Sequence, residues 1–250
     1  MLKIILVGCG GKMGAAVTER IANTSGIEIV AGVDKFSTAQ KPYPVYTAIN
    51  EVAMPADVII DFSHPDVVLE VIDYAVKNNI SLVECTTGLS DEQTKRIHSA
   101  SKEVAIFSSF NMSLGVNLIT ELAKTAAAIL GDFDIEIIEQ HHNQKIDAPS
   151  GTAYMLANAI NETLNNKMQF NYDRHSTRAK RSKKEIGIHS IRGGNIVGEH
   201  EVIFAGTDEI IKISHSARSK EVFATGAVNA AKFIDGKPAG LYDMQDIIKE

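Results

Sequence analysis

The sequence predicts an α/β, doubly wound parallel sheet followed by a second, α+β domain with a mostly antiparallel sheet. Three observations lead to this fold class. Short runs rich in Val and Ile alternate with stretches of helical period through about the first hundred residues, which is typical of parallel strands joined by helices. A glycine-rich segment directly follows the first of these runs. After Leu114 the pattern changes to strand-like runs separated by glycines and Asp, which is typical of antiparallel pairing.

The first half of the chain is predicted to contain parallel strands joined by helices in right-handed crossovers. The strands are expected at Leu2–Val7, Ile27–Val33, Val58–Phe62, Ile80–Val83 and Val104–Phe107. Helices are expected where apolar residues recur three and four positions apart, at Lys12–Ala22, Asp66–Lys77 and Ser90–Ser101. The last of them starts with Ser90 and has Gln93 three positions later, which is a capping box.

The second half has a different pattern. Helices are expected at Leu114–Leu130, Gly151–Leu164 and Glu221–Ile234, and strands at Asp134–Glu139, Ile186–Ile191, Glu199–Phe204 and Glu209–His215. The last three strands follow one another with short turns between them, so they predict an antiparallel meander. We place the boundary between the two domains near residue 112, with the second domain over residues 113–220.

Composition excludes several classes of protein. The chain has 250 residues, enough for two modest domains, and its net charge of −6 argues against nucleic acid or an anionic membrane as the main partner. No segment approaches the ~18 unbroken apolar residues of a membrane span, and the N-terminus does not resemble a signal peptide. Cys9 and Cys85 form neither a disulfide framework nor a cysteine zinc site. We therefore expect a cytoplasmic location.

The segment Gly8–Gly14 leads from the first strand into the first helix and predicts a dinucleotide site. Its glycines allow a tight turn and a close approach of the backbone to a pyrophosphate, which the N-terminus of the helix attracts. Asp34 lies 20 residues beyond Gly14, where a carboxylate accepts hydrogen bonds from ribose hydroxyls. Lys35 is suited to pair with a 2′-phosphate, so both NADH and NADPH are expected to be accepted. The alternative is that the glycines serve only the strand-to-helix turn.

The segment Glu139–Thr152 lies between a predicted strand and a predicted helix and is rich in reactive side chains. His141, His142 and Lys145 together provide groups for proton transfer and positive charge. The alternatives are a solvated loop or a metal site, and the metal site is the weaker because the His-Glu-x-x-His pattern is absent. The remaining histidines stand alone and are interpreted as structural or exposed; they are His64, His98, His175, His189, His200 and His215.

A basic run extends from Arg174 to Lys184. It lacks the interleaved aromatic residues of a nucleic-acid patch, and the whole chain is acidic. We interpret it as a solvated loop that draws anions toward the protein.

Eight segments are shared with one known family and cover nearly the whole chain. They are Gly8–Gly14, Ile60–Pro65, Thr86–Gly88, Asn111–Asn117, Glu139–Thr152, His189–Gly194, Gly198–His200 and Gly240–Met244. With them the chain strongly resembles the dihydrodipicolinate reductase family of the diaminopimelate route to lysine. The pattern over residues 141–152 is close to diagnostic, whereas the glycine loop is common to many dehydrogenases.

The resemblance implies NAD(P)H-dependent reduction of 4-hydroxy-tetrahydrodipicolinate to tetrahydrodipicolinate, with a Rossmann-like first domain. It implies that His141 is an acid/base and Lys145 the proton donor. The residues that it places around a carboxylate of the substrate are His142, Ser150, Gly151 and Thr152. The residues that it places around the cofactor are Gly8, Cys9, Gly10, Gly11, Lys12, Met13, Asp34, Lys35, Cys85, Thr86, Thr87, Ser109, Phe110, Asn111 and Met112. No metal is implied.

The resemblance also implies a homotetramer built largely through the sheet of the second domain. It further implies that residues 221–250 return to the first domain and complete it. Because the reduced nicotinamide must meet the ring carbon that accepts its hydride, we also expect the domains to close on the substrate. Two positions depart from the family pattern. Cys85 stands where the family usually has Gly, and Lys220 stands where Arg is common.

Two other functions are weighed against this one. A semialdehyde dehydrogenase would use Cys85 as an acyl-accepting nucleophile. A sensor that binds a dinucleotide without turnover would have no need for the pair formed by His141 and Lys145, and that pair therefore favours the reductase.

Overall fold

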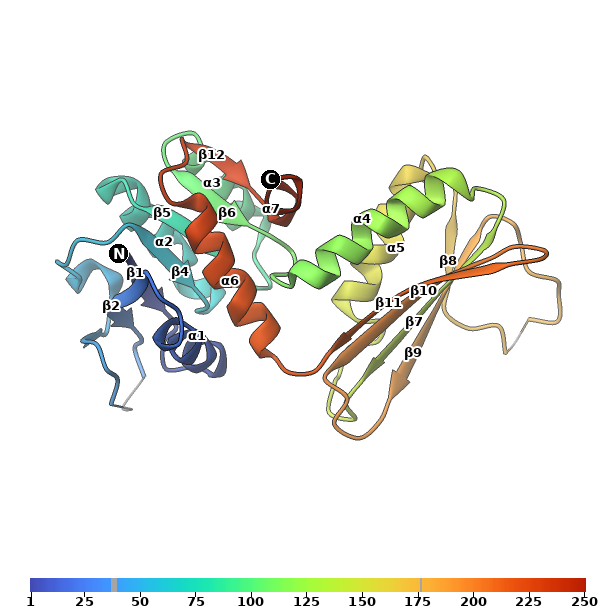
Figure 1. The fold of residues 1–250 in the computed structure, drawn as a ribbon, viewed down its shortest axis with the longest axis horizontal. Coiled ribbons are helices and arrows are strands. Elements are labelled where there is room, and N and C mark those ends of the chain that lie inside the picture. Colours follow the sequence, from blue (N-terminus) through green and yellow to red (C-terminus); the bar gives the residue numbers. More distant parts are fainter. Residues whose placement is uncertain (37–39, 176) are drawn as a thin grey trace. The chain divides into compact units, whose positions relative to one another are not determined.

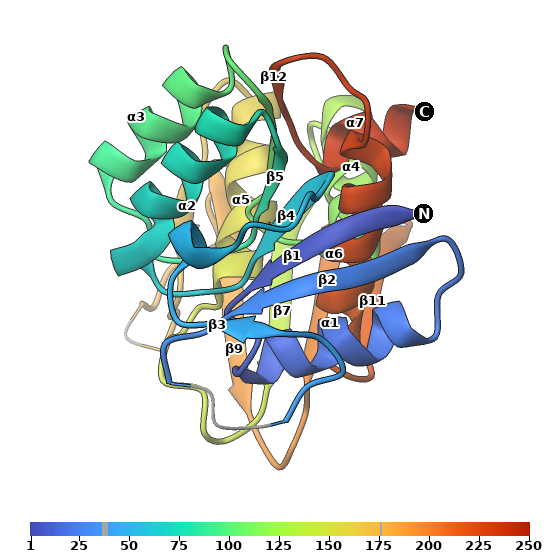
Figure 2. The same cartoon turned by 90° about the vertical axis from the view of Figure 1, so that its left-hand side faces the viewer.

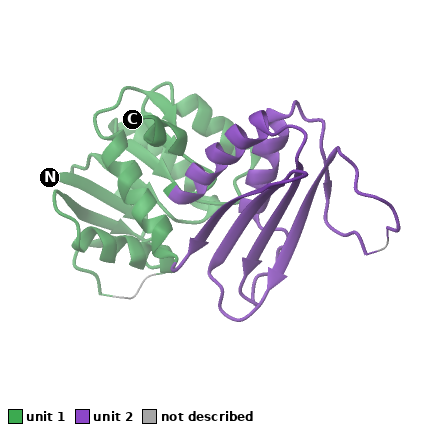
Figure 3. Ribbon diagram, turned by 45° about the vertical axis from the view of Figure 1, so that its right-hand side comes forward, with its two compact units in different colours: residues 1–114, 220–250 green, residues 115–219 purple. Residues whose placement is uncertain are grey.

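The computed structural model describes residues 1–36, 40–175 and 177–250. The contacts divide it into two compact units. The first contains residues 1–114 and 220–250, and the second contains residues 115–219 (Figure 3). None of the helices within the described ranges is long and apolar enough to span a membrane.

The first unit is a parallel sheet of seven strands in the order β12-β6-β5-β4-β1-β2-β3 (Figures 1 and 2). The strands are β1 (Leu2–Val7), β2 (Ile27–Val33), β3 (Val45–Tyr46), β4 (Val58–Asp61), β5 (Ser81–Glu84), β6 (Ala105–Ser108) and β12 (Gly240–Tyr242). The helices are α1 (Lys12–Ala22), α2 (Pro65–Asn78), α3 (Asp91–Ala100), α6 (Glu221–Ile234) and α7 (Met244–Lys249), with a short 3-10 turn at Ile49–Glu51. The doubly wound parallel fold is thus confirmed.

Helices cover both faces of this sheet. One apolar cluster joins the sheet to α1 and α6, and it includes Ile4, Val17 and Ala227. The other joins the opposite face to α2 and α3, and it includes Ile59, Ile72 and Ile97. Because both faces are buried, the central strands are continuous apolar runs, which is why their positions could be predicted to within one residue.

The second unit is a mixed sheet of five strands in the order β11-β10-β7-β9-β8. Its elements are α4 (Leu114–Ile129), β7 (Asp134–His141), α5 (Gly151–Thr163), β8 (Gln169–Asn171), β9 (Glu185–Arg192), β10 (Gly198–Ala205) and β11 (Ile210–Ala217). Apolar side chains of α4 and α5 pack on one face of the sheet, around Ile135, Leu156 and Phe204.

The strand order of this second sheet corrects the predicted meander. β10 pairs antiparallel with β11 and with β7, but β9 and β8 are joined in parallel pairings, with β7 between β9 and β10. Alternating side chains identify each strand but not its neighbours, so the insertion of β7 could not be seen in the sequence. The insertion places the end of β7, at His141, between the ends of two other strands.

Candidate active site

The glycine loop packs tightly against the end of β4. Gly8 has a positive φ of 76°, and a Cβ built on it would lie 2.4 Å from the carbonyl oxygen of Phe62. A Cβ on Gly14 would lie 2.3 Å from the carbonyl oxygen of Gly8. Backbone atoms are in the way at both positions, so neither can take a larger residue without moving the loop.

We expect Gly14→Ala to lower the free energy of unfolding by about 1–3 kcal/mol, because the added methyl group overlaps the backbone of Gly8 and Cys9. Gly11→Ala is the matched control, since its Cβ would meet only the Gly8 oxygen at an ordinary 3.5 Å. Urea unfolding of both variants measures the difference. Equal stability of the two variants would contradict the role given to Gly14.

Asp34 connects the glycine loop to the end of β2. Its Oδ2 accepts the N–H of Gly10 at 2.9 Å, and its Oδ1 accepts the N–H of Phe36 at 3.0 Å. The carboxylate therefore fixes the loop on one side and the chain after β2 on the other. This places a negative charge at the carboxyl edge of the sheet, beside the N-terminus of α1.

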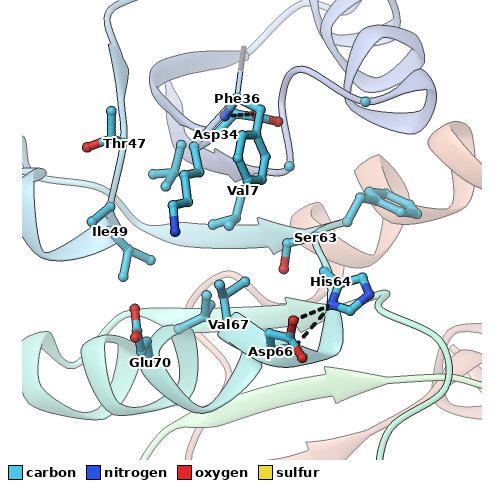
Figure 4. Close-up of a pocket in the computed structure, with 17 residues that line it drawn as sticks. Val7, Asp34, Phe36, Thr47, Ile49, Ser63, His64, Asp66, Val67 and Glu70 are labelled. Atoms are coloured by element: carbon cyan, nitrogen blue, oxygen red, sulfur yellow. Dashed lines mark hydrogen bonds and ion pairs between the residues drawn. The ribbon is translucent and has the colours of Figure 1, made fainter.

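A cavity of about 810 Å³ opens at this edge of the sheet. Figure 4 shows Thr47 and Ile49 on one side of it and Ser63 and His64 on the other. The cavity is lined by Val7, Gly8, Gly11, Val33, Asp34, Lys35, Phe36, Thr47, Ala48, Ile49, Phe62, Ser63, His64, Asp66, Val67, Glu70 and Val71. It lies where β1 has β2 on one side and β4 on the other, which is the usual place for a dinucleotide in such a sheet.

Four of the residues predicted to bind a cofactor line this cavity: Gly8, Gly11, Asp34 and Lys35. Cys9 does not line the cavity, because its side chain is buried against Gly32. Burial, together with the charge of Asp34, raises the pKa of its thiol. Gly10 lies in the loop and Lys12 and Met13 begin α1, but none of the three lines the cavity. Sequence reasoning did not assign Ser63 and His64 to the cavity. Their position directly after the third predicted strand was the signal that could have found them.

The remaining predicted cofactor residues lie at the ends of β5 and β6, outside this cavity. Thr86 donates its N–H to Glu84 Oε1 at 2.7 Å, and Thr87 follows it as an exposed residue. After β6, Ser109 donates its hydroxyl to the carbonyl of Asn111 at 3.1 Å. Phe110 is exposed and Met112 is buried, so these two side chains point to different surroundings.

Cys85 is poorly suited to act as a nucleophile. Burial raises the pKa of its thiol well above the usual value, and the nearby carboxyl groups of Glu84 and Asp61 raise it further. A thiol that stays protonated near neutral pH does not attack a carbonyl readily. This weighs against the semialdehyde dehydrogenase.

In the second unit, His141 at the end of β7 is held by a buried carboxylate. Its Nδ1 lies 2.6 Å from Oε2 of Glu139, whose side chain is fully buried. Arg192 at the end of β9 donates two hydrogen bonds to the same carboxylate, at 2.9 and 2.7 Å. The arrangement follows from strand register, because His141 pairs with Arg192 across β7 and β9. Sequence reasoning did not identify Glu139 or Arg192 as part of the site.

Burial is the main reason that the imidazole of His141 is neutral. Burial alone would raise the pKa of Glu139, but hydrogen bonds from Arg192, Ser190 and His141 outweigh it and lower the pKa to about 2. Burial lowers the pKa of His141, the Glu139 carboxylate opposes this, and the charges of Lys145 and Arg192 lower it further. A neutral ring that donates Nδ1–H to a fixed carboxylate presents Nε2 as an acceptor.

His200 on β10 also belongs to this cluster, although its position alone in the sequence led us to interpret it as structural. Its ring stands at 74° to the ring of His141, with the centroids 5.3 Å apart. Its Nε2 lies 3.1 Å from the hydroxyl oxygen of Ser150. Burial is the main cause that lowers the pKa of His200 to about 4, so this ring is neutral as well.

The loop after His141 carries Lys145 close to the imidazole. The loop turns where Lys145 donates its N–H to the carbonyl of His142 at 3.1 Å, and Asn143 donates its N–H to Gly194 at 3.2 Å. The Lys145 ammonium lies 2.7 Å from Oδ1 of Asp147. The structure thus places His141 at the end of β7, with the half-buried His142 and Lys145 in the loop that follows.

The same loop ends at the N-terminus of α5. Ser150 is the N-cap, its hydroxyl accepts the N–H of Ala153 at 3.2 Å, and its own N–H is donated to Glu139 at 3.1 Å. Gly151 and Thr152 follow as the first residues of the helix, and a Cβ on Gly151 would meet nothing within 4 Å. The N-terminus of a helix and a nearby ammonium together favour a carboxylate.

The basic run has internal partners. Arg181 contacts Glu136 and Asp134 at 2.8 and 3.1 Å, and Lys183 contacts Asp134 at 3.2 Å. Arg174 pairs with Glu185 at 2.5 Å. These cations are therefore largely neutralised within the second unit. Across residues 1–36, 40–175 and 177–250 no group of three or more His, Cys, Asp or Glu is arranged to hold a metal ion.

Comparisons with known proteins cover both units. A family model described as the N-terminus of dihydrodipicolinate reductase matches residues 2–112, and one described as its C-terminus matches residues 115–248. A 4-hydroxy-tetrahydrodipicolinate reductase of Caldanaerobacter subterraneus subsp. tengcongensis is 51% identical over 250 residues, with 100% of this chain and 99% of the relative covered. The reductase of Clostridium novyi gives the same identity and coverage. A dipicolinate-bound dihydrodipicolinate reductase from Paenisporosarcina sp. TG-14 is similar in structure, with a TM-score of 0.84, 27% identity and 99% of each chain covered.

Proposed function

The chain belongs to the dihydrodipicolinate reductase family, and we propose that the first unit binds NADH or NADPH and the second binds the dicarboxylate. The reaction is the reduction of 4-hydroxy-tetrahydrodipicolinate in the diaminopimelate route to lysine, so the chain is an oxidoreductase. The observation that carries the proposed roles is the position of His141 at the end of β7, where Glu139 binds its Nδ1 and Arg192 binds Glu139, directly before the loop that carries Lys145.

The cavity of the first unit has the features that a dinucleotide requires. The glycine backbone allows a pyrophosphate to approach the N-terminus of α1, and Asp34 lies where ribose hydroxyls would be bound. We propose that the loops after β5 and β6 hold the nicotinamide half, through Thr86, Thr87 and residues 109–112. When bound, the reduced nicotinamide supplies a hydride.

The second unit has the features that an anionic ring requires. The relative from Paenisporosarcina binds dipicolinate, which is a small dicarboxylate. We propose that Lys145, His142 and the N-terminus of α5 at Ser150, Gly151 and Thr152 hold one carboxylate of the substrate. Positive charge and N–H donors of this kind bind a carboxylate through charge-assisted hydrogen bonds.

The protein groups complete the reaction by moving a proton. After water leaves the substrate, one ring carbon accepts the hydride and the adjacent centre needs a proton. We propose that the ammonium of Lys145 donates this proton and that His141 Nε2 relays the replacement from solvent. Glu139 holds the imidazole in the required tautomer by accepting Nδ1–H, and the bidentate Arg192 keeps Glu139 ionised.

The test couples this protein to a synthase that forms the substrate from pyruvate and aspartate semialdehyde. The expected result is a loss of NADH or NADPH absorbance that depends on the synthase product. Binding of the dinucleotide without any such loss would support a sensor and overturn the reductase.

Lys35 is the residue that we expect to distinguish the two cofactors. It lines the cavity next to Asp34 and is suited to pair with the 2′-phosphate of NADPH. An exposed ion pair is worth about 0.2–1 kcal/mol, so Lys35→Ala should raise KM for NADPH about two- to fivefold and leave KM for NADH nearly unchanged. Initial rates with each cofactor measure this. Equal changes in the two KM values would exclude Lys35 as the discriminating residue.

We further propose that the protein is a cytoplasmic homotetramer assembled through the second sheet. The face of this sheet opposite to α4 and α5 exposes Ile191 and Ile210, which favours burial against another subunit. Light scattering of the purified protein measures the number of chains.

A further inference from the structure

Two acidic residues end neighbouring strands inside the first unit and take no part in the roles described so far. Asp61 is the last residue of β4 and Glu84 the last residue of β5, and the two are register partners in the parallel pairing. β4 and β5 lie side by side in Figure 2. Asp61 is 0% exposed and Glu84 is 2% exposed. Residues with these side chains are rarely buried to this extent without a partner.

Each carboxyl group holds the turn that follows its own strand. Asp61 Oδ1 accepts the N–H of Ser63 at 2.8 Å, and Glu84 Oε1 accepts the N–H of Thr86 at 2.7 Å. The first turn reaches the wall of the cavity through Ser63, and the second carries the residues proposed to hold the nicotinamide half. The two carboxyl groups thus connect the sheet to both halves of the proposed cofactor site.

The other oxygen of each carboxyl group is buried. These atoms are Asp61 Oδ2 and Glu84 Oε2; they and the buried hydroxyl oxygens of Ser63 and Thr86 make no hydrogen bond of good geometry within the described ranges. As register partners the two carboxyl groups are close enough to interact. An ionised carboxylate only accepts hydrogen bonds, so a proton held between the two groups supplies a hydrogen bond that two ionised carboxylates cannot make.

The residues that pair with Asp61 and Glu84 on the adjacent strands carry no positive charge. On the adjacent strands Asp61 is the partner of Val7 and Glu84 is the partner of Ser108, neither of which is charged. On α2 the buried Tyr74 donates its hydroxyl to Val52. The ion pair of Arg96 with Asp73, between α3 and α2, lies at the surface. The thiol of Cys85 also interacts with the pair, and it is neutral because its pKa is raised well above the usual value.

We propose that Asp61 and Glu84 share one proton at neutral pH, and that the protonated pair positions the Ser63 and Thr86 turns for the dinucleotide. The pair acts through the two turns, so Glu84 and Asp61 are positioning residues. Its effect on cofactor binding rests on the proposed function, but the presence of the proton does not.

The electrostatics agree with this proposal. Burial raises the pKa of Asp61 to about 6, although hydrogen bonds from Ser63 oppose the shift. Burial raises the pKa of Glu84 well above its usual value, and the charge of Asp61 raises it further. Loss of the shared proton at higher pH would leave two buried negative charges on neighbouring strands, and their repulsion would displace the two turns. Affinity for NADH and stability should therefore both fall as the pair deprotonates.

The test begins with the parent protein without ligand. Infrared spectroscopy, recorded as a function of pH, detects the carbonyl band of a protonated carboxyl group. We expect such a band at neutral pH and its loss at higher pH. Glu84→Gln keeps an acceptor for the N–H of Thr86 and supplies an amide donor to Asp61, so the band should be absent while the turns are retained. Glu103→Gln, an exposed position in the same unit, is the matched control and should keep the band.

The second arm measures the dissociation constant of NADH by fluorescence across the same pH range. In the parent and in Glu103→Gln the dissociation constant should rise as the band disappears. In Glu84→Gln it should no longer follow that transition. Asp61→Asn provides a second variant with the same expectation if Glu84→Gln does not fold.

Three results would overturn different parts of the proposal. A parent protein without the band at neutral pH has an ionised pair, held by a bound cation or water, and overturns the shared proton. A band that disappears with no change in NADH affinity overturns the positioning role. A parent protein that fails to bind either dinucleotide at any pH overturns the proposed function instead, and the infrared result still stands.

Discussion

Replacement of Lys145 by alanine is expected to lower kcat about 10²- to 10⁴-fold, the usual contribution of a positioned proton donor. The ammonium is held 2.7 Å from Asp147 in the loop that follows His141, and its charge lowers the pKa of that imidazole. Without it, the ring centre next to the reduced carbon must take its proton from water. The cavity proposed for the cofactor is lined only by residues of the first unit, so the dissociation constant of NADH should stay unchanged.

Single-turnover rates and NADH titration separate these two effects. Lys167→Ala is the matched control, because Lys167 is an exposed lysine in the same unit and belongs to no site described above. KM for the dicarboxylate should also rise in Lys145→Ala, since the ammonium is proposed to contact a carboxylate. His141→Ala is expected to lower kcat as well. If both variants turned over substrate like the parent, the assignment of the proton donor and relay would be wrong.

The fold of the first unit could be read from the sequence because its strands are buried on both faces. Runs such as Leu2–Val7 and Ile27–Val33 contain little but apolar residues, and a glycine turn marks the start of α1. β3 and β12 were missed, since two or three residues are too few to show a period. The order of the second sheet was also missed, because period-two patterns do not identify the neighbour of a strand.

In the candidate site, too, residues close together in sequence could be predicted, and residues joined only by strand pairing could not. His141 and Lys145 are close in sequence, so their pattern could be recognised, whereas Glu139 and Arg192 are 53 positions apart and meet only through the pairing of β7 with β9. A signal was present, since Glu139 occupies a core-facing position in a strand that alternates apolar and polar residues. Asp61 gives a comparable signal, because a charged residue ends an otherwise apolar strand. A charged residue at a buried strand position therefore predicts a partner, though not which one.

Replacement of Arg192 by methionine is expected to destabilise the protein by about 3–5 kcal/mol, the usual cost of leaving one partner of a buried ion pair alone. Glu139 is fully buried, and Arg192 gives it two hydrogen bonds. After the substitution the carboxylate keeps Ser150 and His141 but loses its counter-charge, so its pKa must rise. The charge of Arg192 also lowers the pKa of His141, and its removal should raise that pKa.

The pH dependence of stability gives a test of this ion pair. The pKa of Glu139 is lowered to about 2 from an ordinary value of 4.5, which corresponds to roughly 3 kcal/mol of stability. A lowered carboxyl pKa stabilises the fold above the unfolded value, and the contribution is lost as the pH falls from about 4.5 toward 2. The difference in unfolding free energy between the parent and Arg192→Met should therefore be largest at neutral pH and shrink in acid.

Two further variants show whether the loss of stability in Arg192→Met comes from the missing positive charge or from the missing pair of hydrogen bonds. Arg192→Lys keeps a cation but cannot form the two parallel hydrogen bonds, so its stability should lie between those of the parent and Arg192→Met. Lys212→Met removes the exposed pair with Glu201 from the same sheet and should cost less than about 1 kcal/mol. Urea unfolding at several pH values and NMR titration of His141 provide the measurements. If Arg192→Met cost no more than Lys212→Met, and the pKa of His141 did not move, the imidazole would be held by Glu139 alone, and the guanidinium would have no part in fixing the proton relay.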